Sequence, residues 1–152
     1  MNKSFLQRAG ASFAAVLAGA AALPAYAAAQ VDAQLPPEHD AGKVSYLSGG
    51  IGEGEAHRFE AAFGRYPLVV QLFEQDGKAT VYTADAQVKI TDRKGDVVFD
   101  RHAEGPFMLL RLPAGDYRVA ATLRGQALAE RSVHVTDSGH ARATFVFPQA
   151  AG

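Results

Sequence analysis

The sequence contains no cysteine, and this absence excludes several kinds of chemistry. Without thiols the protein forms no disulfide, uses no thiolate nucleophile and binds no metal through sulfur. It also lacks the lipid-bearing cysteine of a bacterial lipoprotein. The fold must therefore be stabilised by its core, without covalent cross-links.

Clusters of basic residues are also scarce. Arg93 and Lys94 form the only adjacent basic pair, and they lie in a predicted turn. Without Lys3 and Arg8, 13 of the 15 basic residues remain against 16 acidic residues, which gives a formal charge of about −3. Nucleic-acid binding draws on clustered Lys and Arg that neutralise several phosphates at once, so we expect no nucleic-acid partner.

Long apolar runs are missing except near the N-terminus. Residues 9–23 carry no charge, follow Lys3 and Arg8, and end before Pro24. This run of about 15 residues is short against the roughly 20 that a membrane-spanning helix needs. A basic start followed by a short apolar run is typical of a cleaved export signal.

Small residues beyond this run indicate where the signal is cut. Ala25 and Ala27 fit the two positions that a signal peptidase requires to be small. We expect cleavage after Ala27, and cleavage after Ala29 is a close alternative. The mature protein is then expected in the periplasm, without a membrane span.

About 125 residues follow the signal, which is the size of one ordinary domain. Residues 28–42 are poor in apolar side chains and are predicted to be a flexible leader. The domain is predicted over residues 43–148, and residues 149–152 are predicted to be a disordered tail.

Alternation of apolar and polar residues is the dominant pattern of the domain. In residues 86–90, 117–123 and 141–147 every second side chain is apolar, and turn residues such as those of 92–96 separate the segments. This pattern is typical of half-buried strands. About seven short strands predict an all-β fold, a single antiparallel seven-stranded Greek-key-type sandwich. Parallel pairing is not expected, since no helical crossovers are predicted.

Two segments depart from this alternation. Ala56, Phe59, Ala62 and Phe63 have helical spacing, so one short helix is predicted over residues 55–63, near the N-terminus of the domain, with Gly64 as its cap. Residues 107–110 are continuously apolar, as expected of a strand buried on both faces under that helix. The alternative, an apolar face left open for a partner, is less favoured because a helix is available to cover it.

The stretch L-P-A-G-D-Y-R-V at residues 112–119 resembles the turn and strand motif of carboxypeptidase regulatory-like domains, which belong with transthyretin-like sandwiches. The resemblance extends over about residues 44–147. It implies the fold and is nearly silent on function. The motif also has a mechanical role, because Tyr117 can pack its ring inward while its hydroxyl bonds to the backbone.

Enzymatic activities known among relatives of that family are not implied here. The chain has no room for a zinc peptidase domain beside this one, and it ends in F-V-F-P-Q-A-A-G, not in the Tyr-Arg-Gly-Ser of a purine-product hydrolase. Its serines lie in no Gly-x-Ser-x-Gly elbow. His134 alternates with valines and is expected to point outward on a strand.

Two groups of side chains are candidate metal ligands. Asp100, His102 and Glu104 would share one face if their strand extends that far. Glu53 and His57, with Glu55 and Glu60 beside them, surround the glycine-rich loop at residues 49–54. In both groups the favoured interpretation is an ordinary solvated face, so no metal or cofactor is expected.

These observations favour a non-enzymatic periplasmic accessory or interaction module that binds an unknown protein or glycan partner in the cell envelope. Two alternatives remain open. One is a small metal-dependent or hydrolytic enzyme that uses the candidate residues above. The other is a structural subunit that adds an edge strand to an envelope assembly.

Overall fold

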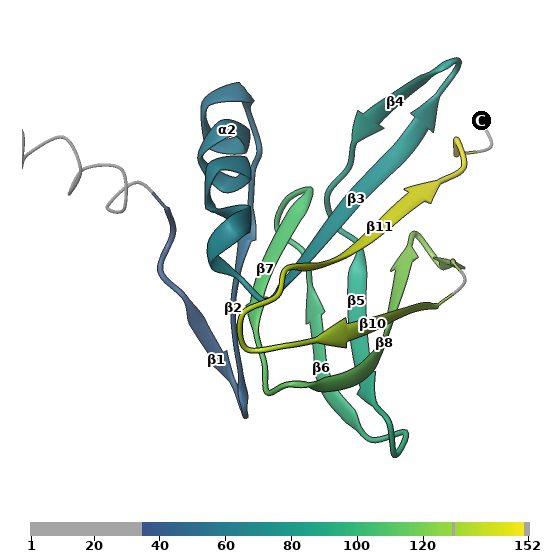
Figure 1. Ribbon diagram of the computed structural model, residues 1–152. Coiled ribbons are helices and arrows are strands. Elements are labelled where there is room, and N and C mark those ends of the chain that lie inside the picture. The colour runs from purple at the N-terminus through teal and green to yellow at the C-terminus, as the bar shows by residue number, and fades with distance from the viewer. Residues whose placement is uncertain (1–34, 129, 151–152) are drawn as a thin grey trace, which may run out of the picture.

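The computed structural model describes residues 35–128 and 130–150, so the predicted signal, its cleavage sites at Ala27 and Ala29, and residues 151–152 lie outside the described residues. The described part is mostly β, with one short α-helix (Figure 1). Its elements are β1 (His39–Ala41), β2 (Val44–Gly49), α2 (Glu53–Ala62), the 3-10 helix η1 (Phe63–Arg65), β3 (Leu68–Asp76), β4 (Ala79–Tyr82), β5 (Gln87–Asp92), β6 (Val97–His102), β7 (Phe107–Arg111), β8 (Gly115–Leu123), β9 (Gln126–Ala127), β10 (Arg131–Val135) and β11 (Ala141–Phe147).

The strands form two sheets. The first sheet has the order β1-β2-β7-β3-β11, and β4 pairs with the second half of β3. The second sheet has the order β10-β8-β5-β6, and β9 pairs with the end of β8. The main core lies between the sheets and contains fully buried side chains such as Ile90, Val119 and Phe145. Alternation therefore predicted the shared interior correctly.

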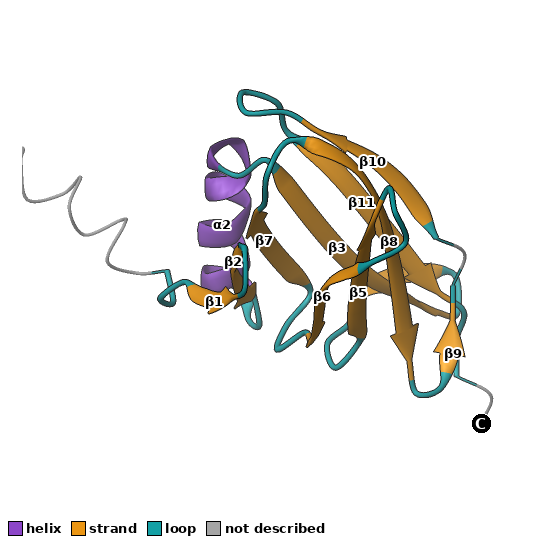
Figure 2. Ribbon diagram, turned by 90° about the horizontal axis from the view of Figure 1, so that it is seen from below, coloured by secondary structure: helices purple, strands orange, loops and turns teal. Residues whose placement is uncertain are grey.

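A second, smaller core lies on the other face of the first sheet. There α2 packs over β2 and β7 (Figure 2), and Phe59 lies against Phe107 and Leu109. Residues 107–110 are fully buried because the helix covers one face of β7 and the second sheet covers the other. The prediction of a doubly buried strand under the helix is confirmed.

The expectation of a purely antiparallel sandwich with seven strands was wrong. The described residues contain eleven strands, and β11 runs parallel to β3 with Ala141 opposite Leu68. A parallel pair needs a long crossover. Here the connection contains the whole second sheet, which the chain builds between β4 and β11 together with β7 of the first sheet.

Smaller corrections concern the ends of the elements. The predicted leader overlaps β1, which pairs with β2, because tertiary pairing stabilises a segment that has little apolar content. The helix begins at Glu53, and Gly64 lies inside η1 and does not cap α2 in a left-handed conformation. Beyond β11, Gln149 accepts a hydrogen bond from the Gly77 amide at 3.2 Å.

The predicted role of Tyr117 is confirmed. Its ring is buried, and its hydroxyl donates a hydrogen bond of 2.6 Å to the Pro113 carbonyl. This contact ties the turn to the start of β8. Among the described residues, no helix is both long and apolar enough to cross a membrane.

Candidate functional site

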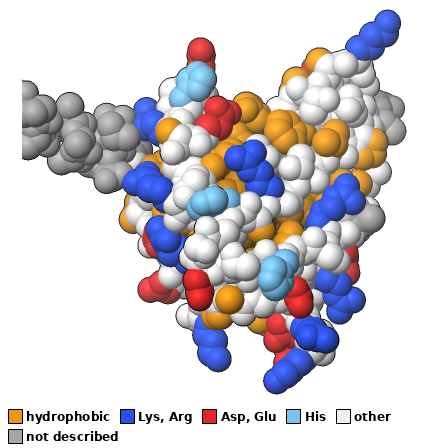
Figure 3. All heavy atoms as spheres, in the orientation of Figure 1, with side chains coloured by type: hydrophobic (Ala, Val, Ile, Leu, Met, Phe, Trp, Pro, Cys, Tyr) orange, Lys and Arg blue, Asp and Glu red, His pale blue; other side chains and the backbone are white. Residues whose placement is uncertain are grey.

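A groove of about 660 Å³ opens between α2 and the end of β4. We call it the α2–β4 groove. Figure 3 shows hydrophobic side chains gathered in the hollow between the helix and the β3–β4 hairpin. The groove is lined by Gly50, Ile51, Gly52, Glu53, Ala56, His57, Glu60, Tyr82, Thr83, Ala84 and Pro106. Its size falls within the range of small-molecule sites.

The glycine-rich loop between β2 and α2 forms one end of the groove. Gly50 has a φ of +100°, and a Cβ added there would lie 2.5 Å from the ring of Phe107. The Gly50 amide donates a hydrogen bond of 3.1 Å to the Glu55 carboxylate. Because Glu55 is used in this way, it fixes the loop and does not join the other acidic side chains at the rim.

The opposite wall is built by Tyr82, the last residue of β4. Its ring stacks on Phe73 with centroids 5.2 Å apart and meets Phe107 edge-on at 5.0 Å. Its hydroxyl donates a hydrogen bond of 2.7 Å to Glu60, across the groove. This bond, together with partial burial, raises the pKa of Tyr82. Tyr82 nevertheless remains 48% exposed, and Ile51 on the loop is 63% exposed.

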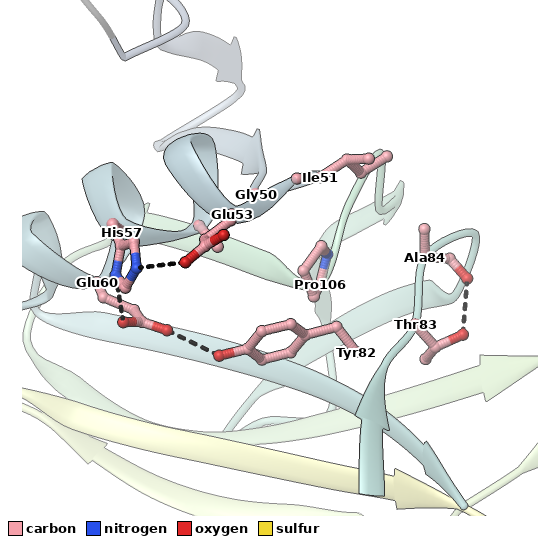
Figure 4. A pocket seen from close by; sticks show the side chains of 11 residues that line it. Gly50, Ile51, Glu53, His57, Glu60, Tyr82, Thr83, Ala84 and Pro106 are labelled. Atoms are coloured by element: carbon pink, nitrogen blue, oxygen red, sulfur yellow. Dashed lines mark hydrogen bonds and ion pairs between the residues drawn. The ribbon is translucent and has the colours of Figure 1, made fainter. Parts of the chain in front are cut away.

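Acidic side chains border the groove on the helix side (Figure 4). His57 lies between Glu53 and Glu60, with nitrogen-to-oxygen distances of 3.8 and 3.7 Å. No Lys or Arg is among the lining residues. The site therefore combines an apolar interior with a rim that favours a positively charged group.

This cluster does not have the geometry of a metal site. All three side chains project from successive turns of one exposed helix face, and their contacts with each other are ion pairs. In the described ranges, no group of three or more His, Asp or Glu residues is placed to hold a metal ion.

Nor does the structure bring Asp100, His102 and Glu104 together. The Asp100 carboxylate accepts a hydrogen bond of 2.6 Å from Gln87, and His102 lies 3.4 Å from Asp85. Strand β6 ends at His102, and the Glu104 amide bonds to the Ser48 hydroxyl in the following turn. The side chains of Asp100 and His102 thus have separate partners, and Glu104 lies beyond the end of the strand.

A His–Asp pair on the second sheet was missed by the sequence argument. His134 is exposed, as expected, and its Nδ1 lies 2.6 Å from Asp116. The two residues are direct partners across β8 and β10, which local sequence does not reveal. Ser132 lies on the same strand, but no hydrogen bond joins its hydroxyl to His134 among the described residues, so they form no catalytic triad.

The α2–β4 groove also lacks a prepared nucleophile. Thr83 is the only lining residue with an aliphatic hydroxyl. That hydroxyl bonds to Glu74 and to the Ala84 carbonyl, not to His57. General-base activation requires a hydrogen bond between nucleophile and base, and the Thr83 hydroxyl has its bonds to Glu74 and Ala84 instead.

Comparison of the chain with family models, curated proteins and solved structures gave no match.

Proposed function

We propose that this protein is a non-enzymatic interaction module of the periplasm and that it binds its partner in the α2–β4 groove. The observation that carries the proposal is the exposure of Ile51 and Tyr82 on either side of an apolar groove. Large apolar side chains that remain exposed together mark binding surfaces. Aromatic residues such as tyrosine are also frequent at the centres of such surfaces.

The motif at residues 112–119 supports placing the domain with carboxypeptidase regulatory-like sandwiches, and the Tyr117 hydrogen bond fits this proposal. In such scaffolds specificity belongs to loops and edges, not to the sheets. Apart from α2, the α2–β4 groove is built from such parts, namely the β2–α2 loop and the end of the short strand β4.

Export is tested by cell fractionation and N-terminal sequencing of the full-length gene product. We expect a periplasmic protein that begins at Ala28, or at Gln30 if the second site is used. A full-length protein in the cytoplasm would refute export.

Binding is tested by placing a photo-crosslinking amino acid at single positions in cells that produce the protein. We expect a discrete adduct from Ile51 and from Tyr82. Val97 is the matched control, since it is 56% exposed and lies on β6, outside the groove. Equal adducts at all three positions, or adducts at Val97 alone, would contradict the proposal.

A further inference from the structure

The first sheet has an open edge at β4. Residues 68–71 of β3 pair with β7, and residues 73–76 of the same strand pair with β4. Beside β7 lies β2, which ends at Gly49, where the chain turns into α2. In the described part of the chain β4 has β3 as its only partner. A position for one more strand is therefore vacant beside β4, on the side of the helix (Figure 1).

The hydrogen-bond pattern shows which backbone groups face this vacant position. The Thr83 amide donates to the Leu72 carbonyl at 3.1 Å, so residue 83 bonds towards β3, while the Leu72 amide donates to the Pro106 carbonyl. Along an antiparallel strand, residues that bond to one neighbouring strand alternate with residues whose amide and carbonyl groups point to the other side. Val81 therefore bonds towards β3, while Thr80 and Tyr82 direct their amide and carbonyl groups to the open edge.

The open edge and the groove belong to the same surface. Tyr82 carries outward-facing backbone groups and also forms a wall of the groove. An extended chain added beside β4 would lie between that strand and α2. Its side chains alternate in direction, so every second side chain would point towards the apolar space next to Ile51 and Pro106.

Charge restricts the occupant further. Glu53 and Glu60 are the charged side chains at the rim, besides the titratable His57. Glu60 accepts one hydrogen bond from Tyr82, lies 3.7 Å from the His57 ring and is exposed to solvent. A carboxylate of this kind favours Lys or Arg in a partner.

We propose that the occupant of the α2–β4 groove is an extended peptide segment of a partner protein, which adds to the open edge of β4, inserts an apolar side chain and places Lys or Arg next to Glu60. This inference rests on the proposed function and narrows its partner to a peptide. Strand addition of this kind supplies affinity through the backbone and specificity through alternate side chains.

The probe for this proposal is a library of random eight-residue peptides, selected on the purified mature protein. We expect enriched sequences with an apolar residue and a nearby Lys or Arg. Synthetic copies are then N-methylated at one residue at a time, and their affinities are measured by fluorescence anisotropy. We expect N-methylation to lower the affinity about tenfold at every second residue and to have little effect at the residues between, because only alternate amides would bond to β4.

Matched protein variants test the same contact from the other side. Thr80→Pro removes an amide that faces the open edge and leaves the ladder to β3 intact, since edge strands accept proline. It should weaken peptide binding about tenfold, whereas Thr80→Val, which keeps the amide, should not. Glu60→Gln should selectively weaken peptides that contain Lys or Arg. Thermal unfolding checks that each variant is folded. If Thr80→Pro does not fold, the N-methylated peptides still test strand addition on the unmodified protein.

Several outcomes would overturn the inference. These are a failure to enrich any sequence, equal loss at all N-methylated positions, or enrichment of acidic peptides. A glycan captured at Tyr82 in the crosslinking experiment would also overturn it, although the groove would then remain the binding site. Failure of the peptide proposal is thus distinguishable from failure of the proposed function.

Discussion

Close contact between two glycines holds the loop that forms one end of the groove. A Cβ added to Gly105 would lie 2.3 Å from the carbonyl oxygen of Gly49. The neighbouring Ser48 hydroxyl accepts a hydrogen bond of 2.9 Å from the Glu104 amide. The turn before β7 therefore fixes the end of β2, and with it the position of the loop.

Gly105→Ala should destabilise the protein by about 2 kcal/mol, because a backbone atom has to move to admit the methyl group. Gly64→Ala is the control, since a Cβ there meets no atom within 4 Å and the backbone φ is not positive. We expect the control to change the free energy of unfolding by less than about 0.5 kcal/mol. Urea unfolding measures the stability of both variants. If Gly105→Ala were as stable as Gly64→Ala, the close contact would be contradicted.

Tyr66 predicts a dependence of stability on pH. Burial raises its pKa to about 12, and the hydrogen bond of 2.6 Å from its hydroxyl to Glu38 acts in the same direction. The protonated hydroxyl is thus favoured in the folded state. Its contribution is complete below pH 10 and is lost as the pH rises from 10 to 12.

The difference in unfolding free energy between wild type and Tyr66→Phe should therefore shrink steadily from pH 10 to pH 12. Denaturant titrations at several pH values provide the measurement. If the unfolding free energies of wild type and Tyr66→Phe differed by a constant amount from pH 10 to pH 12, the Tyr66 hydroxyl would not be buried and hydrogen-bonded to Glu38 in this way.

At the scale of elements, α2 owes its position to one apolar face. Phe59 is fully buried between the helix and the first sheet. Phe59→Ala should cost about 3 to 5 kcal/mol, as for other large core side chains. Ile51→Ala removes an exposed side chain nearby and should cost less than about 0.5 kcal/mol. Thermal or urea unfolding measures the two stabilities. Equal stability of Phe59→Ala and Ile51→Ala would contradict the packing of Phe59 in the core.

Sequence patterns predicted those elements whose burial is regular. The alternation of β5 and β8 follows from one buried face, and the unbroken apolar run of β7 follows from two. By contrast, all four residues of β4 are exposed, so the sequence left open whether they pair. The three-residue strand β1 likewise has no local signal, because its stability comes from pairing with β2.

At the scale of the whole molecule, non-local pairing limited the prediction. The parallel pair of β3 and β11 joins segments about 70 residues apart, and no periodicity shows which strands will be neighbours. The α2–β4 groove is likewise formed by segments that are far apart in the sequence. The glycine loop and the acidic residues of α2 were recognised in the sequence, but Tyr82 and Pro106 reach the site only through the tertiary fold.

Amide hydrogen exchange of the processed protein, alone and with its purified partner, tests most directly whether this groove is the binding site. We predict slower exchange in residues 79–84 and 50–57 on binding, and unchanged exchange in β6 at the exposed edge of the other sheet. Protection confined to β6 or to the turn at residues 92–96, with β4 unchanged, would contradict it.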